Sequence, residues 1–154
     1  MSGESDLIKL YSARILELAA MMPRVGRLQN PDVSVQKRAP LCGSTVTVDI
    51  TTDGEIITDY AADVKACALG QAAASVVGSN IIGQSRQQVR TARDALKAML
   101  SEDAARPPAP FDELEVLRAA SGFANRHASI LLTLDALVEA WMRSKPPARD
   151  AQLK

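Results

Sequence analysis

The chain has 154 residues, which is enough for one domain with a substantial core, and its 47% hydrophobic and 23% charged residues are typical of a globular protein. Eighteen basic and eighteen acidic residues give a formal net charge of zero, so no field of one sign is available to attract nucleic acid or an anionic membrane. Aromatic residues make up only 3%, which also argues against a surface for stacking single-stranded nucleic acid.

The N-terminal segment predicts a cytoplasmic protein whose first element is a helix. Residues 1–6 are acidic and polar, unlike a secretory signal, and no stretch approaches the ~20 apolar residues that a membrane span needs. Apolar residues then recur at helical spacing, so residues 6–22 are expected to form an amphipathic helix that Pro23 ends. The two cysteines are expected to remain thiols in this compartment.

The middle of the chain predicts a short antiparallel sheet. Residues 45–50 alternate strictly between polar and apolar, as a half-buried strand should, and residues 56–64 would form the returning strand. Between them, Asp53 and Gly54 are the residue types that a tight hairpin needs at positive φ. A third strand is expected near residues 33–38, after the turn signal at 30–32.

From residue 66 onward the pattern becomes helical. A first helix is expected over about 67–81, and a capping box of Ser85 and Gln88 predicts the start of a second. The proline-rich loop at 106–110 cannot be helical; a short helix follows at 112–120, and Asn125 is expected to cap a long final helix. Residues 1–143 are predicted to form a single domain, and residues 144–154 a disordered tail.

Three side chains at the ends of these elements could bind a metal. Cys67 is expected at a helix N-terminus, where free amides and the helix dipole favour the thiolate. Cys42 precedes Gly43, which would let a ligand approach the backbone, and His127 falls in the first turn of the last helix. Two thiolates and an imidazole would suit Zn²⁺ or an iron–sulfur unit, with Asp63 as a further ligand.

The same residues also have a purely structural interpretation. Free cysteine is among the most buried residue types, so each thiol could be inert and packed in the core. A single histidine near a helix start is often a surface residue, and no CxxC or HExxH pattern supports a metal site.

Four segments resemble the U-type iron–sulfur cluster scaffold family, the IscU, SufU and NifU N-terminal-domain proteins. Residues 23–28 look like the family's Pro-Arg-Asn-x-Gly element, and residues 40–43 match its Pro-Leu-Cys-Gly-Asp motif up to the last residue. The hairpin at 53–56 falls where the family has one, and residues 67–75 resemble its second-cysteine helix. The similarity covers about residues 7–143.

The resemblance implies an α+β fold: a small three-stranded antiparallel sheet with an N-terminal helix and several C-terminal helices packed on it. It also implies a ligand set of a first cysteine, an Asp two residues later, a second cysteine, and a third on the last helix. Cys42 and Cys67 carry over, but Ser44 stands at the Asp position. The third cysteine is missing in both plausible registers, which place either Ala128 or Ser129 there.

Three functional hypotheses follow. The first is a divergent, non-enzymatic scaffold that binds iron, zinc or a labile iron–sulfur cluster through Cys42 and Cys67, with His127 assisting; its partners would be a cysteine desulfurase and acceptor proteins, and a homodimer would relieve the ligand shortage. The second is a cluster-free module that docks on a desulfurase or another assembly partner and regulates it. The third is an accessory protein that accepts sulfane sulfur at Cys42 or Cys67.

Overall fold

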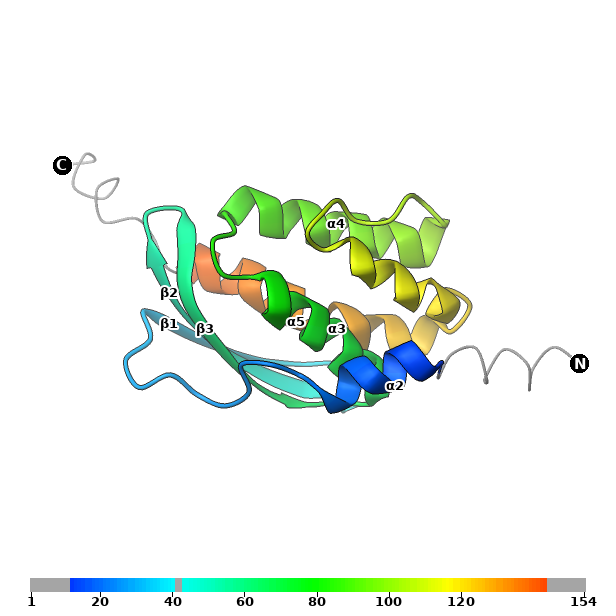
Figure 1. The fold of residues 1–154 in the computed structure, drawn as a ribbon, viewed down its shortest axis with the longest axis horizontal. Helices are drawn as coiled ribbons and strands as arrows, with labels where there is room; N and C mark the ends of the chain where they lie inside the picture. Colours follow the sequence, from blue (N-terminus) through cyan, green and yellow to red (C-terminus); the bar gives the residue numbers. More distant parts are fainter. Residues whose placement is uncertain (1–11, 41–42, 144–154) are drawn as a thin grey trace, which may run out of the picture.

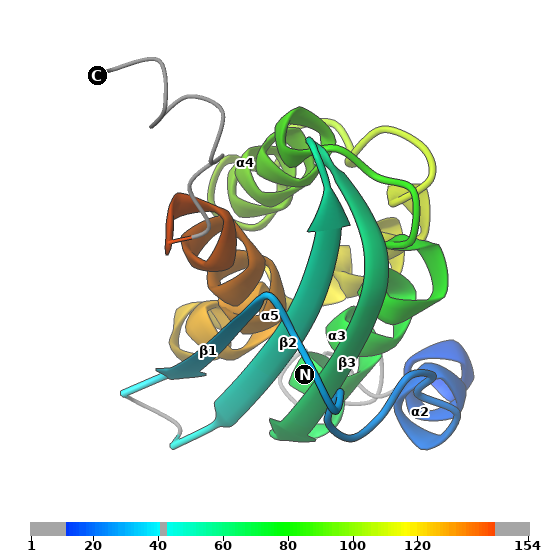
Figure 2. The same ribbon diagram turned by 90° about the vertical axis from the view of Figure 1, so that its left-hand side faces the viewer.

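An antiparallel sheet in the order β1-β2-β3 forms one layer of the protein, and the helices lie on one face of it (Figures 1 and 2). The structure is a computed structural model that describes residues 12–40 and 43–143. The strands are β1 (Val33–Arg38), β2 (Thr45–Asp53) and β3 (Ile56–Lys65), which confirms the predicted sheet. Within the described residues the helices are α2 (Ala13–Ala20), α3 (Ala68–Asn80), α4 (Arg86–Glu102), η1 (Asp112–Ala120) and α5 (Ala124–Arg143).

The strand register follows from the alternation in the sequence. Val48 pairs with both Val35 and Ala62, and all three side chains face the helices and are buried. Asp53 pairs with Ile56, so the hairpin loop is Gly54 and Glu55 rather than the predicted Asp53-Gly54. Of the two loop residues, only Gly54 has a positive φ, at 66°. A two-residue hairpin loop that begins with glycine requires a positive φ at that first position.

α5 is the central helix of the second layer. It packs against α3, α4, β1 and β2, and α4 and η1 lie on the side of α3 and α5 that faces away from the sheet (Figure 1). The apolar residues that recur at helical spacing along α5 form its predicted stripe, and all of them are buried except the half-buried Val138: Ile130, Leu131, Leu134, Leu137, Val138 and Trp141. Ser129, Thr133 and Ala136 are buried as well, so the covered surface of α5 is wider than the predicted stripe. The fold class implied by the resemblance is therefore confirmed.

The helix ends agree with the sequence in some places and not in others. The capping box opens α4 as predicted: the Gln88 amide donates to Ser85 Oγ, and the Ser85 amide donates to Gln88 Oε1. Asn125, however, lies inside α5, which begins at Ala124, so the prediction that Asn125 caps this helix is wrong. The short helix at 112–120 is a 3₁₀ helix.

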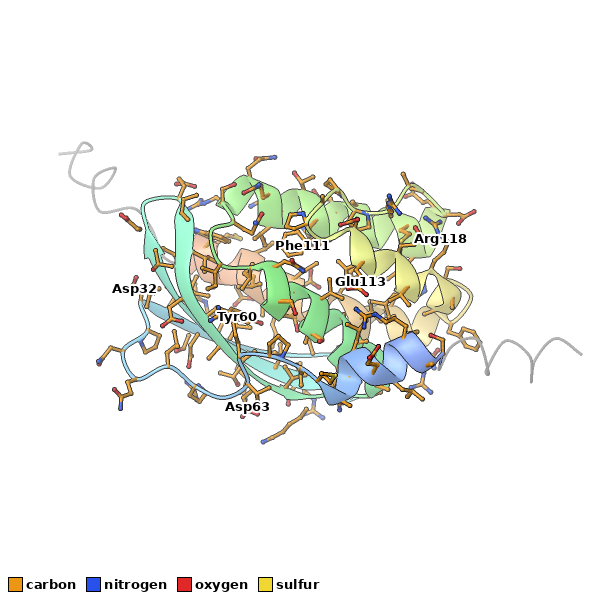
Figure 3. All side chains as sticks on the ribbon, in the orientation of Figure 1. Asp32, Tyr60, Asp63, Phe111, Glu113 and Arg118 are labelled. Carbon is orange, nitrogen blue, oxygen red and sulfur yellow. The ribbon has the colours of Figure 1, made fainter. Side chains whose placement is uncertain are left out.

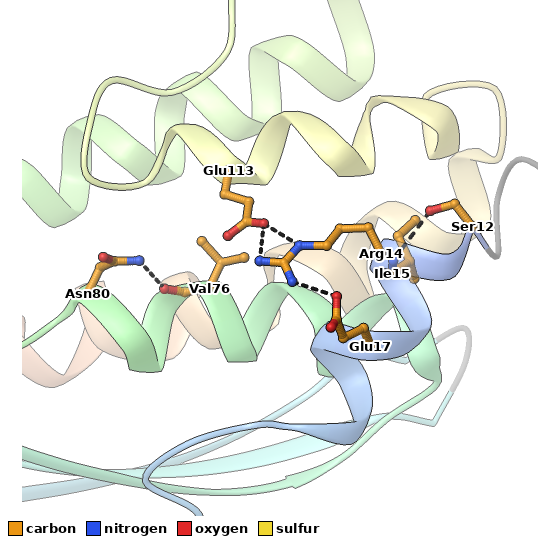
Figure 4. Close-up of polar contacts among 7 residues, drawn as sticks. All are labelled: Ser12, Arg14, Ile15, Glu17, Val76, Asn80 and Glu113. Carbon is orange, nitrogen blue, oxygen red and sulfur yellow. Dashed lines mark hydrogen bonds and ion pairs between the residues drawn. The ribbon is translucent and has the colours of Figure 1, made fainter.

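The first described helix is fixed at its N-terminal end. Ser12 caps α2 by accepting a hydrogen bond from the Ile15 amide, so the helix starts here at Ala13, and residues 6–11 of the predicted helix lie outside the described residues. Arg14 donates to Glu113 of η1 and to Glu17 of α2, as Figure 4 shows. This ion pair joins two segments that lie 99 residues apart in the sequence.

The two faces of the sheet differ in what covers them. On the inner face Tyr60 points toward the helices and is buried, whereas Asp63 lies on the outer face (Figure 3). Asp49 is also on the outer face, yet it is fully buried, because residues 27–28 pack over it. Its carboxylate accepts hydrogen bonds from Arg27, Ser34 and the Leu28 amide.

None of the helices in residues 12–40 and 43–143 is both long and apolar enough to cross a membrane. The predicted tail at 144–154 lies outside the described residues. The core residues of the described segments form one continuous cluster that includes every helix and strand.

Candidate functional site

Three side chains from three elements meet at one end of the sheet. Thr45 at the start of β2 pairs with Lys65 at the end of β3, so Ser44 lies close to the connection that leads to α3. Cys67 is the N-cap residue of α3, and α3 packs along α5. Ser129 of α5 completes the group: its Oγ lies 3.0 Å from Ser44 Oγ and 3.7 Å from Cys67 Sγ. We refer to Ser44, Cys67 and Ser129 as the serine–thiol cluster.

Burial within the serine–thiol cluster is uneven. Ser44 and Ser129 are 4% and 2% exposed, whereas Cys67 is only partly buried. The buried hydroxyls of Ser44 and Ser129 form a hydrogen bond with each other, which avoids the free-energy cost of a buried polar group without a partner. The thiol of Cys67 is therefore the most accessible member of the cluster.

Gly70 allows α3 and α5 to approach closely enough to form this cluster. A Cβ at position 70 would lie 2.6 Å from Ser129 Oγ and 2.8 Å from Ala66 Cβ, closer than real contacts of this kind. The loop that enters α3 is held in place by Gln71, whose side-chain amide donates to the Ala66 carbonyl at 2.8 Å. The position of the thiol is thus determined by packing on both sides.

The surroundings of Cys67 favour its thiolate. Burial would raise the pKa of the thiol, but it is outweighed by the Gly70 amide, the Ser129 hydroxyl, the Leu69 amide and the Arg126 side chain, so the pKa is lowered overall. The Leu69 and Gly70 amides are among the free N–H groups at the N-terminus of α3, which Cys67 precedes as the N-cap residue.

Of the other two predicted ligands, Cys42 adjoins the described part of the site in the sequence, and His127 already has partners for one ring nitrogen. Cys42 lies outside the described residues; its described neighbours Gly43 and Ser44 lie at the same end of the sheet as Cys67. His127 Nε2 lies 3.1 Å from the Ala120 carbonyl oxygen and 3.0 Å from that of Ser121, so it donates its proton there and only Nδ1 remains for another partner.

The other candidate ligands do not gather around Cys67. Asp63 pairs with Thr47 on the outer face of the sheet, away from the helices. In the part of the chain that the structure describes, no three His, Cys, Asp or Glu side chains come together in an arrangement that could hold a metal ion.

Comparison with known proteins identifies the family. The sequence model described as "NifU-like N terminal domain" matches residues 10–126, which is most of the chain. This chain belongs to that family. The N-terminal domain of a nitrogen-fixing NifU-like protein from Brucella abortus has the same fold, with a TM-score of 0.88 and 40% identity over 90% of this chain and 96% of that one.

Two further relatives extend the comparison of this NifU-like domain. The iron–sulfur cluster assembly scaffold protein IscU of Streptococcus pyogenes serotype M1 is 26% identical over 140 residues, covering 91% of this chain and 87% of that protein. A putative scaffold protein for the SUF system from Fervidobacterium islandicum has the same fold, with a TM-score of 0.75, 22% identity, and coverage of 85% of this chain and 96% of that one.

The geometry distinguishes the two registers left open for the last helix of this NifU-like domain. Ser129 contacts both Cys67 and Ser44, whereas Ala128 packs against the edge of the core. This favours the register in which Ser129 stands where the family has its third cysteine. The sequence placed Ser44 at the Asp position and either Ala128 or Ser129 at the third-cysteine position, but it did not indicate that Ser44 and Ser129 bond to each other across 85 residues.

A reactive thiol at Cys67 is the first testable consequence. In the metal-free Cys42→Ser variant, the rate of alkylation by iodoacetamide should rise with pH around a midpoint below that of an ordinary cysteine, because the folded site lowers the thiol pKa. Adding Ser129→Ala removes one donor and should move the midpoint upward. A midpoint unchanged by Ser129→Ala would contradict the role given to this hydroxyl.

Proposed function

We propose that this protein is a scaffold-like carrier of iron–sulfur cluster assembly in the cytoplasm, holding iron, zinc or a labile cluster as cargo on Cys42 and Cys67 and catalysing no reaction of its own. The observation that carries the proposal is the serine–thiol cluster: Ser44, Cys67 and Ser129 converge at the sheet end where Gly43 follows Cys42. Membership of the NifU-like family and the likeness to a streptococcal scaffold protein support it.

The donor set favours weak, transient binding. Thiolates are strong ligands for zinc and iron–sulfur units, but neutral serine hydroxyls are poor ones. With serine at positions 44 and 129, this chain supplies two thiolates and at most the Nδ1 atom of His127. The cargo would complete its coordination with ligands from a second copy or from an acceptor protein, and a cysteine desulfurase would supply its sulfur.

Anaerobic reconstitution tests this function. The wild-type chain, given ferrous iron and sulfide, should develop sulfur-to-iron charge-transfer absorption, because Cys42 and Cys67 provide thiolate ligands. Cys42→Ser and Cys67→Ser should each abolish the absorption, and His127→Ala should shorten its lifetime. The matched control is Ser101→Ala, an exposed serine on α4, which should behave as wild type. A colourless, metal-free wild-type product would contradict the proposal.

Restoring the missing ligands is the positive arm of the same experiment. The double variant Ser44→Asp/Ser129→Cys places a carboxylate and a third thiolate beside Cys67, where the two hydroxyls now lie. Loss of cluster to a chelator should then be at least about tenfold slower, a gain of ~1.4 kcal/mol. An unchanged rate would mean that positions 44 and 129 do not face the cargo.

One observation favours a second function, that of a cluster-free module that docks on a desulfurase or other assembly partner. The hydroxyls of Ser44 and Ser129 satisfy each other at 3.0 Å, so the site is complete without a metal. In that case Cys42→Ser and Cys67→Ser would leave binding to the partner intact, while the reconstituted wild-type chain would stay colourless. Persulfide labelling of Cys42 or Cys67 after incubation with a desulfurase would instead identify a sulfur acceptor.

A further inference from the structure

A cleft of about 720 Å³ lies between β1, α4 and α5, and no member of the serine–thiol cluster lines it. These three elements lie side by side in Figure 2. The cleft is lined by four cationic and two anionic side chains, and two apolar ones: Lys37, Arg90, Arg93, Arg143, Asp135, Glu139, Val138 and Met142. We call it the cationic cleft.

The carboxylates in the cationic cleft do not balance its positive charge. Glu139 pairs with Lys37 at 2.9 Å and with Arg143 at 2.5 Å, and Asp135 pairs with Arg93 at 3.2 Å. The exposed side chain of Arg90 makes no ion pair or hydrogen bond with any residue of 12–40 or 43–143. Asp94, outside the lining, also pairs with Arg93 at 2.9 Å, so four cations face three carboxylates and leave a local excess of one positive charge, although the formal net charge of the whole chain is zero.

The lining of the cleft remains open to solvent. The side chain of Arg143 is 57% exposed and that of Lys37 is 37% exposed, and Met142 is 60% exposed. Pockets for small molecules enclose most of the ligand's surface, which this cleft does not do. An open surface with guanidinium groups around an apolar strip is better suited to an extended chain carrying carboxylates, because the fork of arginine matches the geometry of a carboxylate.

We propose that the cationic cleft docks an acidic segment of a partner protein. Carboxylates of the segment pair with Arg90 and compete with Glu139 for Lys37 and Arg143, and an apolar side chain of the segment packs on Met142. The cleft and the serine–thiol cluster share α5, on which Asp135 follows Ser129 by six residues, a rise of about 9 Å along the helix. This docking does not depend on whether the cluster holds a cargo.

The test is a titration of the full-length chain, labelled with nitrogen-15, by a short synthetic peptide of glutamate residues interspersed with leucine. Amide resonances of residues 90, 93, 139 and 142 should shift with saturation, and those of the β2–β3 hairpin should not. A peptide with glutamine in place of each glutamate should not bind. Raising the salt concentration should weaken binding, because the contacts are solvent-exposed charges.

Two variants should change the affinity in opposite directions. Arg90→Glu should weaken peptide binding about tenfold, because a cation without an ion-pair partner among the described residues becomes an anion. Glu139→Gln should strengthen it about threefold, because Lys37 and Arg143 lose their internal partner. The control is Arg106→Glu, an exposed cation outside the cleft, which should leave the affinity unchanged.

Three results of these experiments would overturn the proposal that the cationic cleft docks an acidic segment. Equal weakening by Arg90→Glu and Arg106→Glu would show non-specific attraction. Shifts confined to other surfaces, or no binding of the glutamate peptide, would show that the cleft is not a docking site. Inorganic phosphate that displaces the peptide and binds at least as tightly would make the occupant a small anion.

Discussion

Gly70→Ala is expected to lower the free energy of unfolding by about 2 kcal/mol, although alanine is the better helix former. The new Cβ would lie 2.6 Å from Ser129 Oγ, 2.8 Å from Ala66 Cβ and 3.2 Å from the Ser129 carbonyl oxygen, so α3 and α5 must move apart. Overpacking of this kind costs about 1–3 kcal/mol, and the gain in helix propensity returns less than about 1 kcal/mol. Urea denaturation at neutral pH measures the difference.

Two further variants separate this clash from a general effect of substituting a helical glycine. Gly78→Ala, in the same helix, meets its nearest atom at 3.3 Å, in Pro23, and should change stability by less than about 1 kcal/mol. Ser129→Ala in the Gly70→Ala background removes the closest contact and should recover part of the loss. If Gly70→Ala and Gly78→Ala had equal effects, the close approach of α3 to α5 would not be the cause.

Asp49→Ala is expected to destabilise the fold by about 3 kcal/mol, because it removes a fully buried carboxylate that accepts several hydrogen bonds. Ser34 and the Leu28 amide would lose their acceptor, and the segment over the outer face of the sheet would lose its attachment. Asp59→Ala, an exposed aspartate on β3 whose side chain is 54% exposed, is the control and should stay within about 0.5 kcal/mol.

The contribution of Asp49 should also depend on pH. Burial would raise the pKa of this carboxyl, but hydrogen bonds from Arg27, Ser34 and Leu28 outweigh it, so the folded pKa is lowered. The stabilisation is therefore fully present above the unfolded pKa of about 3.9 and is lost as the pH falls through the folded pKa. The stability of wild type and Asp49→Ala should converge in acid; a constant difference from neutral pH to pH 2 would contradict this assignment.

Local rules were sufficient for much of the fold. Alternation predicted the central strand, the hairpin and turn signals placed the other two, and the capping box at Ser85 predicted the start of α4. Asn125 was misplaced because cap residues are recognised only relative to a helix start that the periodicity leaves uncertain by one or two residues. The burial of Asp49 could not be predicted, because alternation places it on the solvent face and a segment 21 residues away covers it.

The candidate site was predictable only where a local sequence signal positions a residue. Cys67 was expected at a helix N-terminus, and it is the N-cap of α3, because the change from strand to helix pattern is a local signal. The orientation of His127 was not predictable: its ring turns to the carbonyls at the end of η1, a tertiary contact without a sequence motif. The role of His127 as a ligand, and that of Cys42, stay predictions.

The position of α5 has a consequence for the order in which the protein is made. This helix is the last of the described elements, yet it covers the inner face of β1 and β2 and supports α3 and α4. A nascent chain that has emerged only as far as η1 exposes an apolar sheet and lacks the Ser129 wall beside Cys67. Folding therefore completes after α5 has left the ribosome, and the surroundings of Cys67 are not complete before then.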